Sequence, residues 1–118
     1  MVIFGPDLVS KVLAGTKTVT RRRLTHRDGR DIHYHAGKVY AVQPGRGKPH
    51  VGHILIEEVG VQPLRMMRLS DFEAEGLHPR AFIEYWELLH GRYDPDEVVA
   101  VIWFAVAPRC SKCAAWQL

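Results

Sequence analysis

The feature that most constrains the fold is the run VVAVIWFAV at residues 98–106, which is apolar and rich in β-branched side chains. This composition is typical of a central β-strand that is covered on both faces. Such a strand needs other strands beside it and helices packed against the sheet. No apolar run in the sequence is long enough to cross a bilayer.

At 118 residues, the chain has the usual length of one compact domain. Its composition is 47% hydrophobic, which is enough for a core without disulfides or metal. The first residues, MVIFGP, lack the basic start and long apolar region of a signal peptide. We therefore expect one domain in the cytoplasm, without a membrane segment.

Local signals place further elements before the apolar run. Pro6, Asp7 and Gly15 are typical of the start, first turn and end of a helix over residues 6–14. We also predict strands over 17–21, 39–42 and 53–61, and loops over 23–37 and 44–49. Ser70 is a capping residue paired with Glu73 and predicts the start of a second helix. A third helix is predicted to begin near Pro79. The order predicts an α+β fold in which helices flank a small curved sheet or barrel.

Charge is distributed unevenly along the chain. Residues 1–53 carry ten Lys or Arg against three Asp, whereas residues 54–118 carry six Lys or Arg against ten acidic residues. Such asymmetry often marks a surface that contacts phosphates. The alternative is a solvated basic face that the acidic half offsets in three dimensions.

The basic residues are densest between Gly15 and Arg23, in the segment GTKTVTRRR. Alternation along a strand predicts that Lys17 and Arg21 share one face, with Thr20 and Arg22 on the other. A twist or bulge near the glycine can bring Lys17 and Thr20 together. Lys and Arg donate charge-assisted hydrogen bonds to phosphate, although a basic edge strand also resists aggregation.

The run LAGTKTVTRR at residues 13–22 resembles the signature of ASCH domains, Gly-x-Lys-x-x-[polar or acidic]-x-Arg. Gly15, Lys17, Thr20 and Arg22 match it position by position. The segments GKVYAVQPG (37–45), VGHILIEEV (51–59) and LSDFEAEGL (69–77) are similar to later parts of the family pattern, with Lys38 where an acid is commoner. We expect an ASCH domain at residues 1–107 and a C-terminal tail at 108–118.

The resemblance implies a PUA-like fold, a small β-barrel with flanking helices, that binds RNA beside the Gly-x-Lys motif. Some stand-alone members hydrolyse the amide of N4-acetylcytidine with a Lys, a Thr and a Glu, and another is described as a ribonuclease. Motif matching places these three groups on Lys17, Thr20 and Glu75. The basic loops of this chain are longer than those of the compact hydrolase-like members.

Two functions therefore remain open, besides a protein-interaction role for the same face. The first is binding of RNA or a nucleotide-like ligand, for which we predict the binding residues Lys17, Arg21, Arg22, Tyr34, Arg46 and Lys48. The second is hydrolysis, in which Thr20 attacks or positions water and Glu75 is a base or an anchor. Lys17 can act as a base if neighbouring arginines lower its pKa, or, left charged, can hold the oxyanion.

The histidines and cysteines do not predict a metal site or a cofactor. Cys110 and Cys113 provide half of a zinc site, and His33 and His35 lie far from them in sequence without a second standard pair. We predict two free thiols and no zinc. His26, His33 and His35 are predicted loop side chains, and Trp86 and Trp103 are predicted core residues.

Overall fold

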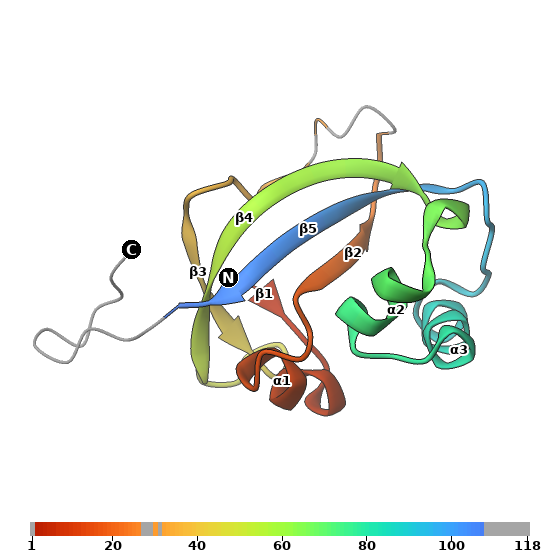
Figure 1. Cartoon of the computed structure of the whole chain (residues 1–118). Helices are drawn as coiled ribbons and strands as arrows, with labels where there is room; N and C mark the ends of the chain where they lie inside the picture. Colours follow the sequence, from red (N-terminus) through yellow and green to blue (C-terminus); the bar gives the residue numbers. More distant parts are fainter. Residues whose placement is uncertain (1, 27–29, 31, 108–118) are drawn as a thin grey trace, which may run out of the picture.

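The computed structural model describes residues 2–26, 30 and 32–107. One sheet with the strand order β1-β3-β4-β5-β2 curves into a half-barrel (Figure 1). The strands are Val2–Ile3 (β1), Val19–Arg23 (β2), Val39–Gln43 (β3), Gly52–Pro63 (β4) and Val98–Val106 (β5). The helices are Pro6–Leu13 (α1), Leu69–Glu75 (α2) and Pro79–His90 (α3), with a 3-10 turn at Leu64–Met66. The predicted α+β fold, with a small barrel-like sheet and flanking helices, is confirmed.

Strand β5 lies inside the sheet, as the apolar run predicts. It pairs antiparallel with β4 on one side and with β2 on the other. Val99, Val101 and Phe104 are almost fully buried. Trp103, predicted to be core, is only half-buried and lies over Gly60 of β4.

Two hydrophobic cores support the sheet at different ends. Helix α1 closes the first, where Leu8 and Val12 pack with β-strand residues such as Ile56 and Phe104. Helix α3 closes the second, where Phe82 and Trp86 pack with Leu64 of the 3-10 turn and Val99 of β5. In Figure 1, α1 lies below the sheet and α2 and α3 lie beside its far end, so β2 runs between the two helical layers.

Strand β2 begins two residues later than predicted, at Val19 rather than Lys17. The amides of Thr16 and Lys17 both donate to the carbonyl of Lys11, which completes the end of α1. The amide of Thr18 then donates to Ala74 of α2. Lys17 therefore lies in the link between α1 and β2, because these backbone groups bond outside the sheet.

Smaller differences from the sequence prediction concern helix ends and exposure. Helix α2 begins at Leu69, and the carboxylate of Asp71 accepts the amide of Arg68, where the sequence predicted Ser70 as the cap. Leu89, predicted to face inward on α3, is 57% exposed. Strand β1 was not predicted; it is a two-residue strand that pairs parallel with β3.

The predicted tail at 108–118, which contains Cys110 and Cys113, lies outside the described residues. Within the described part of the chain, no helix combines the length and the apolar character needed to span a membrane.

Gly76 ends α2 directly after Glu75 in the left-handed region, with φ of 79°, and Gly91 ends α3 with φ of 81°. A Cβ at Gly76 would lie 3.1 Å from Cδ of Lys11 and 3.4 Å from Cβ of Lys17, whereas one at Gly91 would meet nothing within 4 Å. Gly91→Ala should cost about 1–2 kcal/mol from backbone strain alone, and Gly76→Ala should cost more. Urea unfolding of both variants checks this, and equal losses would contradict the close packing at Gly76.

Candidate functional site

The carboxylate of Glu75 forms ion pairs with two cations inside the protein. Its Oε1 lies 2.7 Å from Nζ of Lys17, and its Oε2 lies 2.9 Å from a guanidinium nitrogen of Arg21. Lys17, Arg21 and Glu75 are only 2%, 6% and 3% exposed. Buried charges cost free energy unless they are paired and hydrogen-bonded, so Glu75 is what permits both cations to lie here.

Three elements supply the members of this group, which we call the Glu75 cluster (Lys17, Arg21 and Glu75). Lys17 comes from the link before β2, Arg21 from β2 and Glu75 from the last turn of α2. Lys17 also donates to the backbone carbonyl of Glu75 at 3.0 Å. Lys17 and Arg21 both reach Glu75, although Lys17 precedes the strand on which the sequence prediction placed it.

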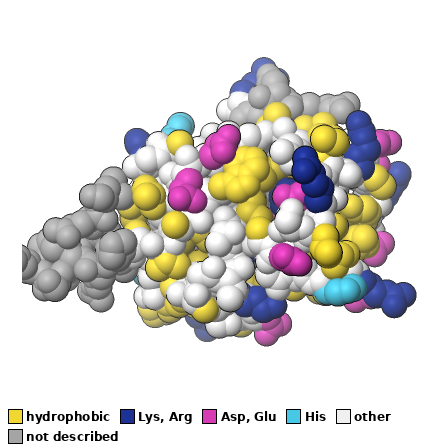
Figure 2. Space-filling view, in the orientation of Figure 1, with side chains coloured by type: hydrophobic (Ala, Val, Ile, Leu, Met, Phe, Trp, Pro, Cys, Tyr) yellow, Lys and Arg dark blue, Asp and Glu magenta, His cyan; other side chains and the backbone are white. Residues whose placement is uncertain are grey.

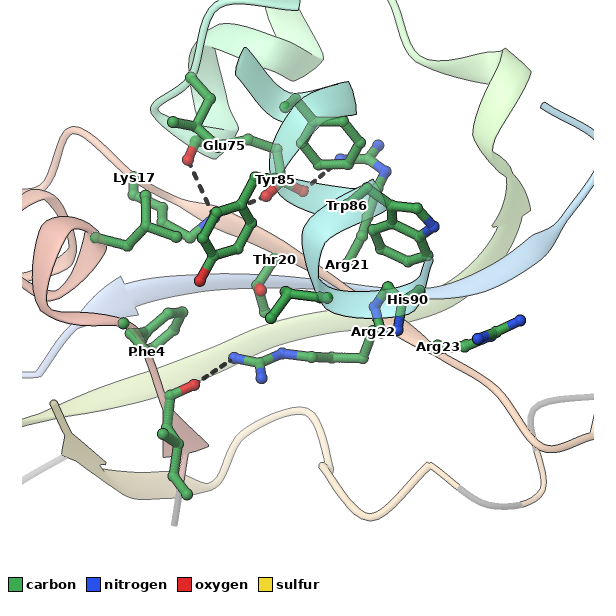
Figure 3. A pocket seen from close by; sticks show the side chains of 16 residues that line it. Phe4, Lys17, Thr20, Arg21, Arg22, Arg23, Glu75, Tyr85, Trp86 and His90 are labelled. Atoms are coloured by element: carbon green, nitrogen blue, oxygen red, sulfur yellow. Dashed lines mark hydrogen bonds and ion pairs between the residues drawn. The ribbon is translucent and has the colours of Figure 1, made fainter. Parts of the chain in front are cut away.

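The Glu75 cluster borders a cavity of about 130 Å³ between β2, the start of α1 and α3. Residues of β2 form one wall, and aromatic residues form much of the others. Figure 3 shows Tyr85 and Trp86 reaching from α3 toward β2, with Phe4 near Lys17 and Arg22. The lining residues include Phe4, Lys17, Thr20, Arg21, Arg22, Arg23, Glu75, Phe82, Tyr85, Trp86 and His90. The cavity thus combines buried charge with flat apolar surfaces.

Arg22 closes one side of the cavity. Its guanidinium donates to the carbonyl of Ile3 at 2.9 Å and lies over the ring of Phe4, 5.2 Å from the centroid. Burial lowers the pKa of Arg22. The side chain spans from β2 to β1 and so connects two edges of the sheet.

Lys17 has a pKa below its ordinary value. Burial is the main cause, and Glu75 partly opposes it. Arg22 and Arg21 lower the pKa further, but their contribution is smaller than that of burial. From the sequence we expected the neighbouring arginines to lower the pKa of Lys17, and desolvation, which is the larger cause, was not considered.

Thr20 is 5% exposed and lines the same cavity as Lys17 and Glu75. Its hydroxyl makes no hydrogen bond to any residue in the described part of the chain. The hydroxyl oxygen is also not one of the fully buried polar atoms that lack a hydrogen-bond partner, so it keeps some accessible surface. The hydroxyl is therefore available to a ligand in the cavity.

The predicted site residues fall into two groups. The structure gathers Lys17, Thr20, Arg21, Arg22 and Glu75 around one cavity. The side chain of Arg21, proposed from sequence as a phosphate contact, is 1% exposed and turned toward Glu75.

The other predicted binding residues lie outside this cavity. Tyr34 lines a neighbouring cavity of about 210 Å³, which shares Arg22 and Arg23 with the first. Arg46 and Lys48 are exposed on the loop between β3 and β4 and line neither of these cavities.

The face of the molecule drawn in Figure 2 is not uniformly basic. In the view of Figure 2, acidic side chains lie among the Lys and Arg side chains. Exposed arginines also have acidic neighbours, as in the pairs Arg65–Asp96 and Arg92–Asp94. Three consecutive arginines of β2 border the cavity, and two of them also have acidic partners, Arg21 with Glu75 and Arg23 with Glu97.

No group of three or more potential metal ligands occurs among residues 2–26, 30 and 32–107. His33 and His35 are exposed, and the two cysteines lie outside this part of the chain. The hypothesis of a zinc site therefore gains no support from the described residues.

Sequence reasoning missed the aromatic side of the cavity. Trp86 was correctly predicted to be buried, but it lines the cavity together with Tyr85 and His90. Trp86 and His90 are four residues apart on α3 and so lie on one helical face, and Tyr85 is next to Trp86 in sequence. This spacing indicates a cavity wall only when the structure shows that α3 lies opposite β2.

Comparison with solved structures identifies the fold. An ASCH domain from Lactobacillus crispatus superposes with a TM-score of 0.65 and 16% identity, over 85% of this chain and 70% of that chain. A protein from Enterococcus faecalis that is assigned to the family model DUF984 superposes with a TM-score of 0.62 and 24% identity, over 85% of this chain and 69% of that chain. The chain has the fold of ASCH domains. The ASCH protein from Zymomonas mobilis agrees, with a TM-score of 0.63 and 15% identity over 90% and 68%.

No family model and no curated protein matches the sequence. The likeness recognised from short motifs is thus confirmed through the ASCH fold. Four residues match the ASCH signature: Gly15 and Lys17 lie in the link between α1 and β2, and Thr20 and Arg22 lie in β2. Their order along the chain is Gly15, Lys17, Thr20 and Arg22. The last three line the cavity.

Removing Glu75 should destabilise the protein more than removing one of its partners. Glu75→Gln leaves Lys17 and Arg21 without a buried anion and should cost about 3–5 kcal/mol, whereas Lys17→Met leaves a neutral pair and should cost less. Asp96→Asn, in an exposed pair with Arg65, is the control and should change stability by less than about 1 kcal/mol. Urea unfolding measures all three, and a larger loss for Lys17→Met would contradict the shared role of Glu75.

Proposed function

We propose that the cavity binds one base of RNA or of a nucleotide-like ligand, with the Glu75 cluster at its polar wall. The observation that carries the proposal is a buried Lys–Glu–Arg group beside an aromatic-lined cavity. Perturbed, buried titratable groups in a cavity are typical of functional sites. RNA-binding sites commonly stack single bases on aromatic side chains, and the ASCH fold supports RNA binding or a related function in general.

The size of the cavity sets what can enter. Its volume of about 130 Å³ is close to that of a protein cavity of about 150 Å³ that holds benzene. It therefore suits one six-membered ring, such as a pyrimidine, and leaves the sugar and phosphate outside. This argues for recognition of a single splayed base and not of a whole nucleotide.

Basic groups near the cavity mouth can hold the phosphates that stay outside. The side chain of Arg23 is 54% exposed, and Arg22 and Arg23 continue into the neighbouring cavity, which Tyr34 lines. A second base can pack there against Tyr34. Arg46 and Lys48, which lie away from the cavity, can add phosphate contacts only to a longer RNA.

Hydrolysis of an amide on the bound base is the second candidate function. It is favoured by three groups that share the cavity: the available Thr20 hydroxyl, the lowered pKa of Lys17 and the carboxylate of Glu75. A neutral Lys17 can take a proton from attacking water or from Thr20, whereas a charged Lys17 can stabilise the oxyanion. Arg21 holds the second oxygen of Glu75 and so orients this carboxylate in either role.

Binding is tested by titrating cytidine and a short single-stranded RNA into the wild-type protein and Lys17→Met. Loss of one charge-assisted hydrogen bond of about 1.5–3 kcal/mol should weaken cytidine binding roughly tenfold to a hundredfold. Lys38→Met removes an exposed lysine outside the cavity and is the matched control. Equal affinity of the Lys17 variant, or no binding of either ligand, would contradict the proposal.

The roles of Arg46 and Lys48 have a separate signature. Arg46→Ala combined with Lys48→Ala should weaken RNA binding and reduce its dependence on salt, because fewer counterions are released. Cytidine binding should stay unchanged, since neither side chain lines the cavity. Unchanged RNA affinity and salt dependence would remove this loop from the binding surface.

Hydrolysis is tested with N4-acetylcytidine, following release of cytidine by chromatography. If Lys17 acts as the base, the rate should rise with pH, with a midpoint below the ordinary lysine pKa of 10.5, because burial favours the neutral amine. Lys17→Arg keeps the charge but cannot lose its proton near these pH values, so it should remove this rise. No product from the wild-type protein would leave binding as the function.

A further inference from the structure

Strand β2 is an edge of the sheet, and its free edge faces the cavity. Among the residues that the structure describes, the strand order ends at β2, which pairs only with β5. Four consecutive β2 residues, from Thr20 to Arg23, line the cavity although successive side chains alternate between faces. The cavity therefore reaches the backbone edge of the strand as well as one of its faces.

The register identifies which backbone groups point away from the sheet. The amide of Phe104 donates to the carbonyl of Thr18, and Val19 lies opposite Trp103. In an antiparallel ladder, hydrogen-bonded and non-hydrogen-bonded pairs alternate. Thr20 and Arg22 consequently bond to β5, whereas the amide and carbonyl of Arg21 point outward.

Two observations indicate that the outward-pointing amide and carbonyl of Arg21 lie at the cavity. Arg21 is 6% exposed as a whole residue, yet its side chain is only 1% exposed, so most of its accessible surface belongs to the main chain. Neither its amide nor its carbonyl bonds to another element in the part of the chain that the structure describes. Val19, the preceding outward position, is 1% exposed, and the adjacent amide of Thr18 donates to Ala74 of α2.

We propose that the main-chain N–H and C=O of Arg21 read the hydrogen-bonding edge of the base in the cavity. The inference rests on the proposed function and specifies its substrate class. One donor and one acceptor side by side match a ring that presents an acceptor next to a donor. Cytosine offers ring N3 beside its 4-amino group, and uracil offers O4 beside N3–H. The pair thus requires a base with an unblocked edge and does not separate cytosine from uracil, while the cavity volume of about 130 Å³ favours pyrimidines over the larger purines.

This arrangement gives the charged side chain of Arg21 a positioning role. Its ion pair with Glu75 fixes the strand at the point where the backbone must meet the ligand. A peptide strand added to the same edge would need several residues in succession whose backbone amide and carbonyl groups point outward and are accessible. Here α2 occupies the edge at Thr18, and the aromatic walls leave room for one ring, so a base fits the site better than a strand.

Amide hydrogen exchange of the whole chain, followed by NMR with and without saturating uridine, tests the inference. In the free protein the Arg21 amide should exchange faster than those of Thr20 and Arg22, which bond to β5. Bound uridine should slow exchange at Arg21 by up to about tenfold, as expected for one added hydrogen bond. A protected Arg21 amide in the free protein would overturn the inference.

Matched ligands separate edge reading from size. Binding of 3-methyluridine, which lacks the N3 donor, should be about tenfold weaker than that of uridine, whereas 5-methyluridine adds the same methyl group elsewhere and should bind like uridine. Equal losses for both ligands, or uridine binding that shifts Tyr85 and Trp86 resonances without affecting the Arg21 amide, would overturn edge reading and leave base binding intact. If no ligand shifts any cavity resonance, the proposed function fails and the inference falls with it.

Discussion

The double ion pair of Glu75 is the interaction on which the site depends. Its two carboxylate oxygens hold Lys17 and Arg21 at 2.7 Å and 2.9 Å, and the three side chains come from separate elements. A buried ion pair is weak evidence for stability, because desolvation offsets most of the attraction. The protein instead obtains a lysine with a lowered pKa, a fixed edge strand and a polar wall beside aromatic surfaces. We interpret the Glu75 cluster as a feature retained for binding or chemistry.

Much of the fold follows from the sequence. The run at 98–106 specified an interior strand, and Pro6, Pro79 and the glycines after each helix set the helix limits to within a few residues. The prediction was less accurate where hydrogen bonds to residues distant in sequence determine where an element begins. Strand β2 starts late because Thr16, Lys17 and Thr18 bond to Lys11 and Ala74, and no local pattern encodes those partners.

The site was predictable only in part, for a similar reason. Motif resemblance named Lys17, Thr20 and Glu75 together, although Lys17 and Glu75 lie 58 residues apart in sequence. Residue types alone do not show that Arg21 turns inward to Glu75, or that α3 brings Tyr85 and Trp86 to the opposite wall. Both depend on how α2 and α3 pack against the edge of the sheet, and the backbone edge of Arg21 has no signature in the sequence at all.

The central claim is that the charged cluster serves the ligand and not the fold. The most direct test replaces all three members at once, as Lys17→Met, Arg21→Met and Glu75→Leu, and measures both the free energy of unfolding and cytidine affinity. Apolar replacement of a whole buried ion cluster is often neutral or stabilising, by about 1–4 kcal/mol. We predict a folded protein of equal or higher stability that no longer binds cytidine. A strongly destabilised variant, or one that binds cytidine as tightly as the wild type, would contradict the account.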